Sequence, residues 1–138
     1  MENKRPCVGI TVLVFSKEKQ ENILIGKRLN EIGYGMYALP GGHIEFGESF
    51  IKTAIREVKE ETNLDIENVE LIKIINCINK KNNYHYVVPV LKGYSKDDTL
   101  LKNMEPNKCE KWEWYNWNNK SILPSPLFYP VEQIILDI

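Results

Sequence analysis

Hydrophobic positions along the chain follow two periods, and the change between them separates strands from a helix. Residues 8–15 form an apolar run rich in β-branched side chains, and a polar segment at 16–22 separates it from a second apolar run at 23–27. This pattern predicts two strands joined as a hairpin. Between residues 49 and 62 the period becomes 3.6, which predicts an amphipathic helix. The apolar positions expected on its buried face are Ile51, Ala54, Ile55, Val58 and Thr62.

Two glycine-containing segments lie between the second strand and this helix. Residues 29–36 contain two glycines and are predicted to form a loop. Residues 37–39 form a short extended piece that ends at Pro40, because proline disfavours helix in the residue before it. Residues 41–47 are predicted to form a glycine-rich loop that leads into the helix.

Strand patterns return after the helix, and a second, shorter helix ends the chain. Residues 69–78 and 84–92 are predicted strands joined across a polar tip, and Pro89 marks the second as an edge strand or the site of a bulge. A long polar loop precedes a last strand at 109–117, and a short helix is expected at 131–137. Because helices and strands do not alternate regularly, we expect an α+β fold with a mixed sheet rather than a doubly wound sheet.

Composition and charge set limits on partners and location. The 138 residues have the length of a single domain, residues 1–138. A net charge of −1 gives no overall basic field for a nucleic-acid backbone, so we expect no nucleic-acid polymer as a partner. Cys7, Cys77 and Cys109 are far apart, which favours free thiols in a reducing compartment over a disulfide or zinc site. The first apolar run lacks a cleavage site and is shorter than the ~20 residues that span a bilayer, so we expect a cytoplasmic protein with no membrane segment.

Acidic residues crowd one flank of the predicted helix. With about 100° of turn per residue and Ile51 at zero, Glu57 lies at about 240°. Glu60 and Glu61 lie at about 180° and 280°. Like charges at this spacing repel by roughly 0.2–0.5 kcal/mol per pair, and one interpretation is a solvated face with basic neighbours. The other is a site for Mg²⁺ or Mn²⁺, since these ions prefer oxygen ligands and Glu48 and the glycines of the preceding loop would complete it.

The loop and the helix together resemble the Nudix box, the signature of the MutT-like Nudix hydrolase family. The box reads G-x5-E-x7-R-E-U-x-E-E-x-G-U, where U is a bulky aliphatic residue, and the chain matches eight of its nine defined positions. The matching residues are Gly42, Glu48, Arg56, Glu57, Val58, Glu60, Glu61 and Leu64. The exception is Asn63 in place of the last glycine. Asparagine is the next most tolerant residue of the left-handed conformation that this helix-ending position requires, so the departure affects stability more than chemistry.

The resemblance extends beyond the box to the human nucleotide triphosphate diphosphatase subgroup of the family. Similar segments follow in the same order, namely RPCVGITVLVF, LIGKR, YALPGGHIEFGE, NYHYVVPVLKG, EPNKCEKWEW and PLFYP. The resemblance implies an α/β/α Nudix sandwich and a homodimer. It implies a Mg²⁺-dependent enzyme, with Mn²⁺ as the alternative ion, that cleaves nucleoside triphosphates to the monophosphate and pyrophosphate. Oxidised or modified deoxynucleotides would be among its substrates, in a role of nucleotide pool sanitation.

The resemblance also assigns roles in metal binding and catalysis. The predicted metal ligands are Glu57, Glu61, the carbonyl of Gly41 and, directly or through water, Glu60. One of these carboxylates, or one outside the box, would accept the proton of the attacking water. Arg56 and Glu48 would belong to the same network and hold the acids in place. Glu110 is the candidate for an acid outside the box that joins the metal site, and Glu105 is the alternative.

A further set of residues would bind the substrate. They are Thr11, Arg28, Leu39, Gly41, Gly42, His43, Phe128 and Tyr129. Arg28 would reach a phosphate, with a strand-end surface charge as its alternative role, and His43 would donate to a phosphate or a sugar hydroxyl. Phe128 and Tyr129 match an aromatic segment beside the nucleobase. Pro130 stands where the subgroup has glycine and lacks an N–H, so a preference for guanine cannot be carried over.

Two other functions stay open. A Nudix pyrophosphatase acting on sugar nucleotides, dinucleotides or other nucleoside diphosphate derivatives would use the same acids with a different pocket. A Nudix domain that binds a nucleotide or a protein without catalysis is the third hypothesis. Domains of that kind usually lose acids of the box, whereas this chain keeps all of them.

Overall fold

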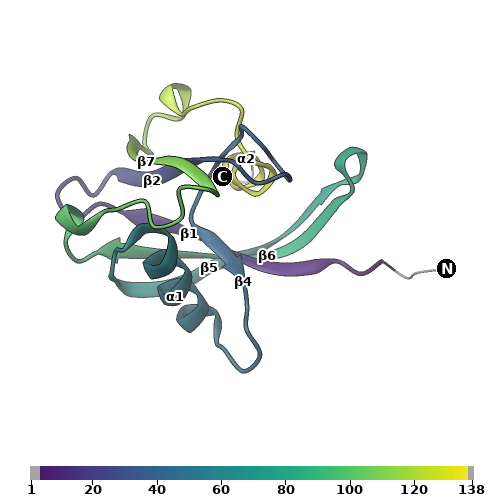
Figure 1. Cartoon of the computed structure of the whole chain (residues 1–138), viewed down its shortest axis with the longest axis horizontal. Coiled ribbons are helices and arrows are strands. Elements are labelled where there is room, and N and C mark those ends of the chain that lie inside the picture. The colour runs from purple at the N-terminus through teal and green to yellow at the C-terminus, as the bar shows by residue number, and fades with distance from the viewer. Residues whose placement is uncertain (1–3, 137–138) are drawn as a thin grey trace.

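The computed structural model describes residues 4–136, which form a mixed β-sheet with one helix on each face (Figure 1). The strands are β1 (Cys7–Phe15), β2 (Asn22–Arg28), β3 (Tyr37–Ala38), β4 (Gly41–His43), β5 (Ile66–Asn79), β6 (Tyr84–Ser95) and β7 (Cys109–Asn116). The helices are α1 (Phe50–Thr62) and α2 (Tyr129–Leu136), and the 3₁₀ turns are η1 (Lys80–Asn82), η2 (Asp98–Leu100) and η3 (Lys120–Ile122). Within the described range, no helix combines the length and the apolar character that a bilayer crossing needs.

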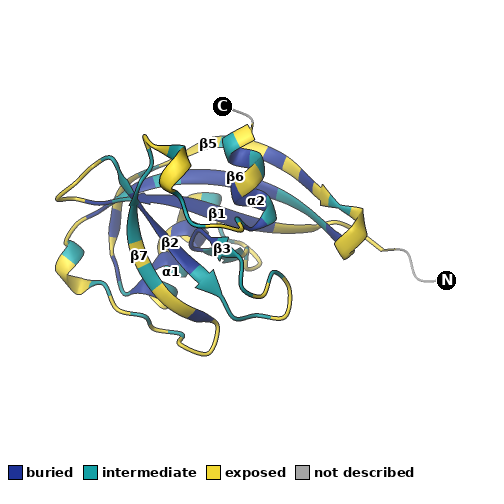
Figure 2. Cartoon of the chain, turned by 90° about the horizontal axis from the view of Figure 1, so that it is seen from above, coloured by how far each residue is buried: buried dark blue, intermediate teal, exposed yellow. Residues whose placement is uncertain are grey.

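The sheet joins sequence-distant strands and separates two hydrophobic cores. Its order is β3-β2-β1-β6-β5, with β4 added to β1 and β7 added to β2. β1 and β6 run parallel, and the other pairs are antiparallel. Val131 and Ile134 of α2 cover one face, while Ala54 and Val58 of α1 cover the other. Most of the buried residues lie in the strands between the two helices (Figure 2). The predicted α+β sandwich with a mixed sheet is confirmed.

The α1 helix is rotated slightly from the predicted orientation. Thr53, Ala54, Val58 and Thr62 are its buried residues. Ile51 and Ile55, predicted to be buried, are instead 43% and 40% exposed. Thr53 replaces them at the core because its hydroxyl has two acceptors for its one proton, the Glu48 carboxylate (3.0 Å) and the Ser49 carbonyl (3.0 Å). A polar residue with satisfied hydrogen bonds can be buried at low cost.

The predicted loop at 41–47 begins with a strand instead. Residues 41–43 form β4, which pairs antiparallel with β1 so that Gly41 lies opposite Thr11 and His43 opposite Gly9. A side chain at Gly41 would collide with the Ile10 carbonyl. Glycine therefore serves close backbone approach here, and only the following residues form the turn into α1.

Pro89 lies in an interior strand, so its interpretation as an edge marker was wrong. β6 is paired with β1 on one side and β5 on the other. The alternative, a bulge, is not found at Pro89 itself, which pairs with Ile74. The nearest register shift is in the partner strand β5, between Leu71 and Lys73. The bridges between β1 and β6 skip from Val87 to Val90, as expected for a residue without an N–H.

The C-terminal helix begins earlier than its sequence pattern indicated. α2 starts at Tyr129, two residues before the predicted start, and the Glu132 amide donates to the Phe128 carbonyl (3.0 Å). Its predicted last residue, Asp137, lies outside the described residues. Because proline is tolerated in the first turn of a helix, Pro130 does not prevent this earlier start.

Candidate active site

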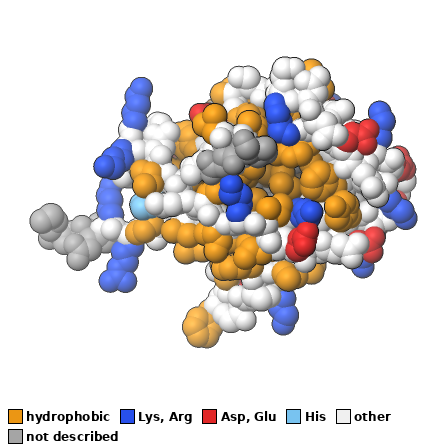
Figure 3. Space-filling model, turned by 180° about the vertical axis from the view of Figure 1, so that it is seen from behind, with side chains coloured by type: hydrophobic (Ala, Val, Ile, Leu, Met, Phe, Trp, Pro, Cys, Tyr) orange, Lys and Arg blue, Asp and Glu red, His pale blue; other side chains and the backbone are white. Residues whose placement is uncertain are grey.

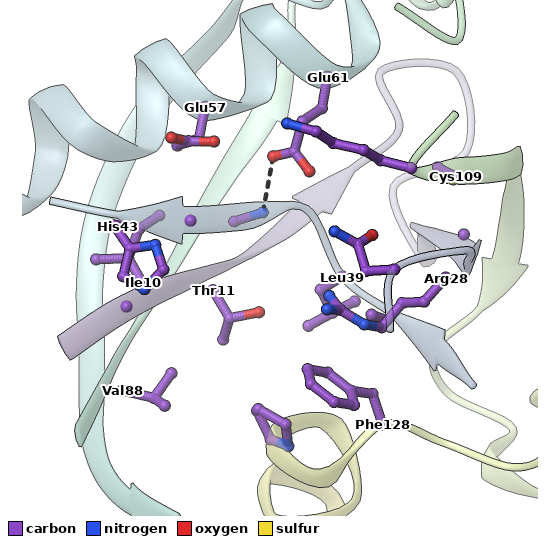
Figure 4. A pocket seen from close by; sticks show the side chains of 18 of the residues that line it. Ile10, Thr11, Arg28, Leu39, His43, Glu57, Glu61, Val88, Cys109 and Phe128 are labelled. Atoms are coloured by element: carbon purple, nitrogen blue, oxygen red, sulfur yellow. Dashed lines mark hydrogen bonds between the residues drawn. The ribbon is translucent and has the colours of Figure 1, made fainter. Parts of the chain in front are cut away.

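A cavity of about 470 Å³ opens between α1, β4 and the start of α2 (Figure 4). Glu57 and Glu61 project from α1 at one end of it. Phe128 and Arg28 lie at the opposite end. We call these the acidic end and the aromatic end. The sheet between the two ends contributes side chains such as Thr11.

Two glycines bring the backbone of β4 directly beneath the acids of α1. The Gly41 N–H donates to Glu61 Oε2 at 3.1 Å. A Cβ atom on Gly42 would lie 2.5 Å from the carboxyl carbon of Glu57. Any side chain at Gly42 would therefore push the Glu57 carboxylate away, which explains the need for glycine at the first position of the box.

Arg56 links the acids of the box to one another. Its Nε and one terminal nitrogen bind the two oxygens of Glu48 at 2.7 and 2.9 Å. Its other terminal nitrogen binds Glu57 at 2.7 Å and Glu60 at 3.2 Å. A further bond reaches the His43 carbonyl at 3.0 Å. This planar fork fixes the rotamers of the acids, as the sequence led us to expect.

The acids of this network have opposite electrostatic environments. The Arg56 guanidinium, with the Glu45 amide, lowers the pKa of Glu48 to about 2. Burial raises the pKa of Glu57, although Arg56 opposes that shift. Burial and the neighbouring Glu57 carboxylate hold the pKa of Glu61 well above its usual value, and the Gly41 N–H offsets this only in part. Negative charge is thus neutralised at Glu48 and left uncompensated at Glu61.

The donor chemistry of the acidic end fits a hard divalent cation. Glu57 and Glu61 offer oxygen ligands beside a glycine backbone, and a cation between them would remove the repulsion that raises the pKa of Glu61. Among residues 4–136, no three histidine, cysteine or acidic side chains are already arranged around one ion. A bound ion would therefore draw on these two carboxylates together with backbone oxygen and water. Mg²⁺ usually keeps several waters, so it suits such a site.

The aromatic end is built from segments that are far apart in the chain. The guanidinium of Arg28 lies 4.1 Å from the centre of the Phe128 ring, and its Nε donates to the Ile32 carbonyl at 2.9 Å. Desolvation by burial lowers the pKa of Arg28. A Cβ atom on Gly33 would lie 2.5 Å from the Phe128 ring and 3.1 Å from Arg28 Nε. Arg28 is therefore a fixed wall of the cavity and not a surface charge.

Most of the predicted substrate-binding residues line the cavity. Those that do are Thr11, Arg28, Leu39, Gly41, Gly42, His43 and Phe128. The His43 ring is hydrogen-bonded to the Tyr86 hydroxyl at 3.0 Å. Tyr129 is outside the lining and packs behind it, against Tyr84 and Phe128. The helix start at Tyr129 turns its ring away from the cavity.

The two candidate acids outside the box have different positions. Glu105 lines the cavity, and its charge contributes to the raised pKa of both Glu57 and Glu61. Glu110 lies outside the lining, where its half-exposed side chain forms an ion pair with Lys27 at 3.7 Å. The strand direction of β7 carries Glu110 away from the acids. The structure thus places the alternative, Glu105, and not Glu110, in the cavity with Glu57 and Glu61.

Some cavity residues were not predicted from the sequence. They include Asn30, Tyr84, Tyr86, Lys108 and Trp112. They come from separate loops and strands, so no local spacing connects them. Pro130, which stands where the resembling subgroup has glycine and which lacks an N–H, also lines the cavity. An alternation of tyrosines in β6 was the one available hint, since residues two apart in a strand face the same side.

The departure from the box at Asn63 is a helix cap. Asn63 has φ 64° and ψ 6°, in the left-handed region, and its N–H donates to the Lys59 carbonyl at 3.0 Å. Its side-chain amide donates to the Leu100 carbonyl at 3.0 Å. The residue therefore ends α1 as glycine would, with one additional bond.

A family model and solved structures are similar to this chain. The profile of the NUDIX domain matches residues 5–127. A MutT NUDIX hydrolase from Burkholderia pseudomallei superposes with a TM-score of 0.83 at 24% identity, covering 98% of this chain and 99% of that one. The NUDIX domain of Shewanella oneidensis NrtR, solved with ADP ribose, superposes with a TM-score of 0.78 at 19% identity, covering 97% and 86%. At these identities the superpositions concern the fold.

Curated relatives match over shorter stretches. An ADP-ribose pyrophosphatase of Methanocaldococcus jannaschii is 42% identical over 59 residues, which is 43% of this chain and 33% of that protein. Nudix hydrolase 3 of Caenorhabditis elegans is 26% identical over 106 residues, which is 75% of this chain and 44% of that protein. The chain thus spans less than half the length of these relatives.

Proposed function

The chain belongs to the NUDIX domain family, and from that premise we propose that it is a Mg²⁺-dependent hydrolase of nucleoside triphosphates. Its products would be a nucleoside monophosphate and pyrophosphate. The observation that carries this proposal is the pair of partly buried carboxylates, Glu57 and Glu61, held over a glycine strand at one end of the cavity. Two such acids are costly without a cation, and phosphoanhydrides are the substrates that bring one.

The chemistry divides between the two ends of the cavity. A divalent ion held by Glu57 and Glu61, with the Gly41 carbonyl and Glu60 as further candidates, would stabilise the charge that develops on the phosphoryl oxygens. A water oxygen attacks phosphorus, the bond from phosphorus to the pyrophosphate oxygen breaks, and the water proton passes to a carboxylate. Glu57, Glu61 and Glu105 are the candidates for that base. Arg56 and Glu48 keep the acids aligned.

The aromatic end would hold the rest of the nucleotide. Arg28 lies on the cavity wall beside Phe128, so it would bind a phosphate oxygen that extends from the acidic end while its guanidinium stays stacked. His43 would donate to a phosphate or sugar hydroxyl. Phe128, Leu39 and Thr11 would enclose the base. Tyr129 would support this wall from behind, through its contact with Phe128.

Three finer parts of the proposal rest on the sequence resemblance. They are membership of the human nucleotide triphosphate diphosphatase subgroup, a role in nucleotide pool sanitation and a homodimeric state. A cytoplasmic location rests on the unpaired cysteines and on the first apolar run, which lacks a cleavage site. Mn²⁺ is the alternative to Mg²⁺ as the ion.

A second candidate function is hydrolysis of a nucleoside diphosphate derivative such as ADP-ribose. The reason to keep it is that a relative is named ADP-ribose pyrophosphatase and that one similar structure contains ADP ribose. The acidic end would act in the same way. Only the group beyond the second phosphate would differ.

The test is a substrate screen read as kcat/KM, because specificity is that ratio. Nucleoside triphosphates, oxidised or modified deoxynucleotides, ADP-ribose, sugar nucleotides and dinucleotides are assayed with Mg²⁺, and products are identified by chromatography. We expect release of pyrophosphate from triphosphates, and loss of that activity in Glu61→Gln. Glu113→Gln, an exposed acid on β7, is the matched control and should retain it. Unchanged turnover by Glu61→Gln would refute the proposal, and sugar phosphate as the main product would favour the second candidate.

A further inference from the structure

The cavity holds more negative charge than the cations around it balance. Five acids line it, namely Glu45, Glu57, Glu60, Glu61 and Glu105. Within the described part of the chain, the arginine and lysine side chains of the lining are Arg28, Arg56 and Lys108. On the face seen from behind, by contrast, most acidic side chains lie beside a basic one (Figure 3). A triphosphate would bring further negative charge to the cavity, so the position of each cation matters.

Two of the three cations already have fixed contacts. Arg56 is bound to the acids of the box and to the His43 carbonyl. Arg28 is stacked on Phe128 and belongs to the aromatic end. Lys108 is therefore the cation whose role is left to explain.

The backbone of Lys108 is fixed, whereas its side chain is held loosely. Its N–H donates to the Glu105 carbonyl at 2.9 Å, and its carbonyl accepts from the Leu29 N–H at 2.9 Å. The preceding loop is tied to α1 by a bond from the Met104 N–H to the Glu61 carbonyl at 3.1 Å. The side-chain nitrogen of Lys108 lies 3.6 Å from Glu105 Oε2, and the side chain is 55% exposed. An exposed ion pair of this length contributes little stability, so it exchanges readily for a stronger contact.

Glu105 brings the Lys108 nitrogen to the acidic end. Both residues line the cavity, and the charge of Glu105 raises the pKa of Glu57 and of Glu61, so Glu105 lies near both acids. An ammonium group 3.6 Å from Glu105 is therefore beside the place where a cation on Glu57 and Glu61 would hold phosphates. The flexible four-carbon stem of a lysine lets this group change partner without moving the backbone.

We propose that Lys108 exchanges Glu105 for the pyrophosphate part of a bound triphosphate and stabilises it as the leaving group. This inference rests on the proposed function, in which Arg28 binds a phosphate from the aromatic end. When the bond from phosphorus to the pyrophosphate oxygen breaks, its electron pair stays on that oxygen, and the ammonium group of Lys108 compensates the added charge. A shorter leaving group offers Lys108 less charge. The substrate class is therefore triphosphates in preference to diphosphates.

The first test measures binding of pyrophosphate with Mg²⁺ to the whole chain by isothermal titration calorimetry. Lys108→Met removes the charge and keeps the stem, and Lys111→Met is the matched control at an exposed lysine of β7. We expect the Kd for pyrophosphate to rise by about tenfold or more in Lys108→Met, because a hydrogen bond to a charged group is lost. Lys111→Met should bind as wild type does, and Lys108→Arg should recover most of the affinity.

The same titrations with adenosine and guanosine monophosphate show which part of the substrate Lys108 contacts. Their Kd values should be unchanged in Lys108→Met, since Arg28 and the aromatic end are intact. Circular dichroism confirms that each variant is folded. An unchanged Kd for pyrophosphate in Lys108→Met, or an equal loss for the monophosphates, overturns the proposal.

A second test asks whether Lys108 acts directly or only through Glu105. Lys108→Met is introduced into wild type and into Glu105→Gln, and the Kd for pyrophosphate is measured in all four proteins. A direct contact predicts that the loss caused by Lys108→Met is at least as large in the Glu105→Gln background. A loss that disappears in that background would show that Lys108 acts through its ion pair alone, which overturns the proposal.

Turnover separates this inference from the proposed function. Lys108→Met should lower kcat/KM for a triphosphate by about tenfold, with a smaller effect on the corresponding diphosphate. If wild type hydrolyses no triphosphate but binds pyrophosphate through Lys108, the proposed function fails and the pyrophosphate site stands. If wild type hydrolyses triphosphates and Lys108→Met does so equally well, the proposed function stands and the role of Lys108 is refuted.

Discussion

The acidic end and the aromatic end of the cavity are built in opposite ways. At the acidic end the side chains come from α1 and from the strand and turn just before it, and most of their bonds join residues close in sequence. At the aromatic end Arg28, Gly33 and Phe128 meet from β2, a loop and the start of α2. The acidic end holds two carboxylates whose pKa values are raised by burial, whereas the aromatic end is closed by packing. Binding at the acidic end should therefore depend mainly on charge, and binding at the aromatic end mainly on shape.

The largest expected effect comes from removing the fork that organises the acidic end. Arg56→Lys keeps the charge but cannot bind Glu48 and Glu57 with a planar group at the same time. We expect kcat/KM to fall by about 10- to 100-fold, the usual range for losing a residue that orients metal ligands. Steady-state kinetics with saturating Mg²⁺ measure this. Activity close to wild type would show that charge alone matters there.

A smaller effect should separate the two acids outside the box. Glu105→Gln removes a carboxylate of the cavity lining and should lower kcat/KM by about tenfold, or about 1.4 kcal/mol. Glu110→Gln breaks an exposed ion pair with Lys27 and should change kcat/KM little, since such pairs contribute about 0–1 kcal/mol. Parallel assays of the two variants provide the comparison. A larger loss for Glu110→Gln than for Glu105→Gln would contradict the assignment of Glu105 to the acidic end.

The aromatic end can be tested with two glycines that share a backbone conformation. Gly33 has φ 71° and Gly35 has φ 80°, so alanine is strained at both. A Cβ atom at Gly33 would collide with Phe128 and approach Arg28, whereas one at Gly35 meets nothing within 4 Å. Gly33→Ala should raise KM by about tenfold, while Gly35→Ala should keep the wild-type KM. Equal KM values in the two variants would show that Gly33 does not position this wall.

The smallest effect is expected for Asn63, the residue that caps the C-terminal end of α1. Asn63→Gly restores the residue of the box and relieves the left-handed backbone but loses the bond to the Leu100 carbonyl, so the free energy of unfolding should change by less than about 0.5 kcal/mol. Asn63→Ala should lose about 1–2 kcal/mol. Both should retain kcat. Denaturant unfolding and kinetics decide this, and a large loss of kcat in either variant would give Asn63 a catalytic role.

Local sequence determined how well each region could be predicted. The acids of α1 and the Asn63 cap follow from spacing and propensity, and the structure places both on α1 as expected. The exposure of Ile51 and Ile55 was missed because burial depends on where the sheet ends and on the bonds that allow Thr53 inward. The strand at residues 41–43 was missed because glycines indicate a loop unless a neighbouring strand pairs with them.

The aromatic end was predicted only in part for a similar reason. Phe128 and Arg28 were named from resemblance, but their stacking depends on a loop bond to Ile32 and on the bare backbone of Gly33. Glu105 and Glu110 are five residues apart, and only the course of the chain into β7 decides which one faces the acids. Residues brought together across about a hundred positions leave no periodic signal in a single sequence.

The central claim is that Glu57 and Glu61 form a site for a divalent cation, and thermal unfolding with and without Mg²⁺ tests it most directly. A ligand that binds the native state raises stability by about 2.7 kcal/mol at 100 times its Kd, which corresponds to roughly 5–10 °C in Tm for a chain of this size. We predict this rise for wild type and for the control Glu113→Gln, and a much smaller rise for Glu57→Gln and Glu61→Gln. An equal rise in Tm for all four proteins would contradict the account.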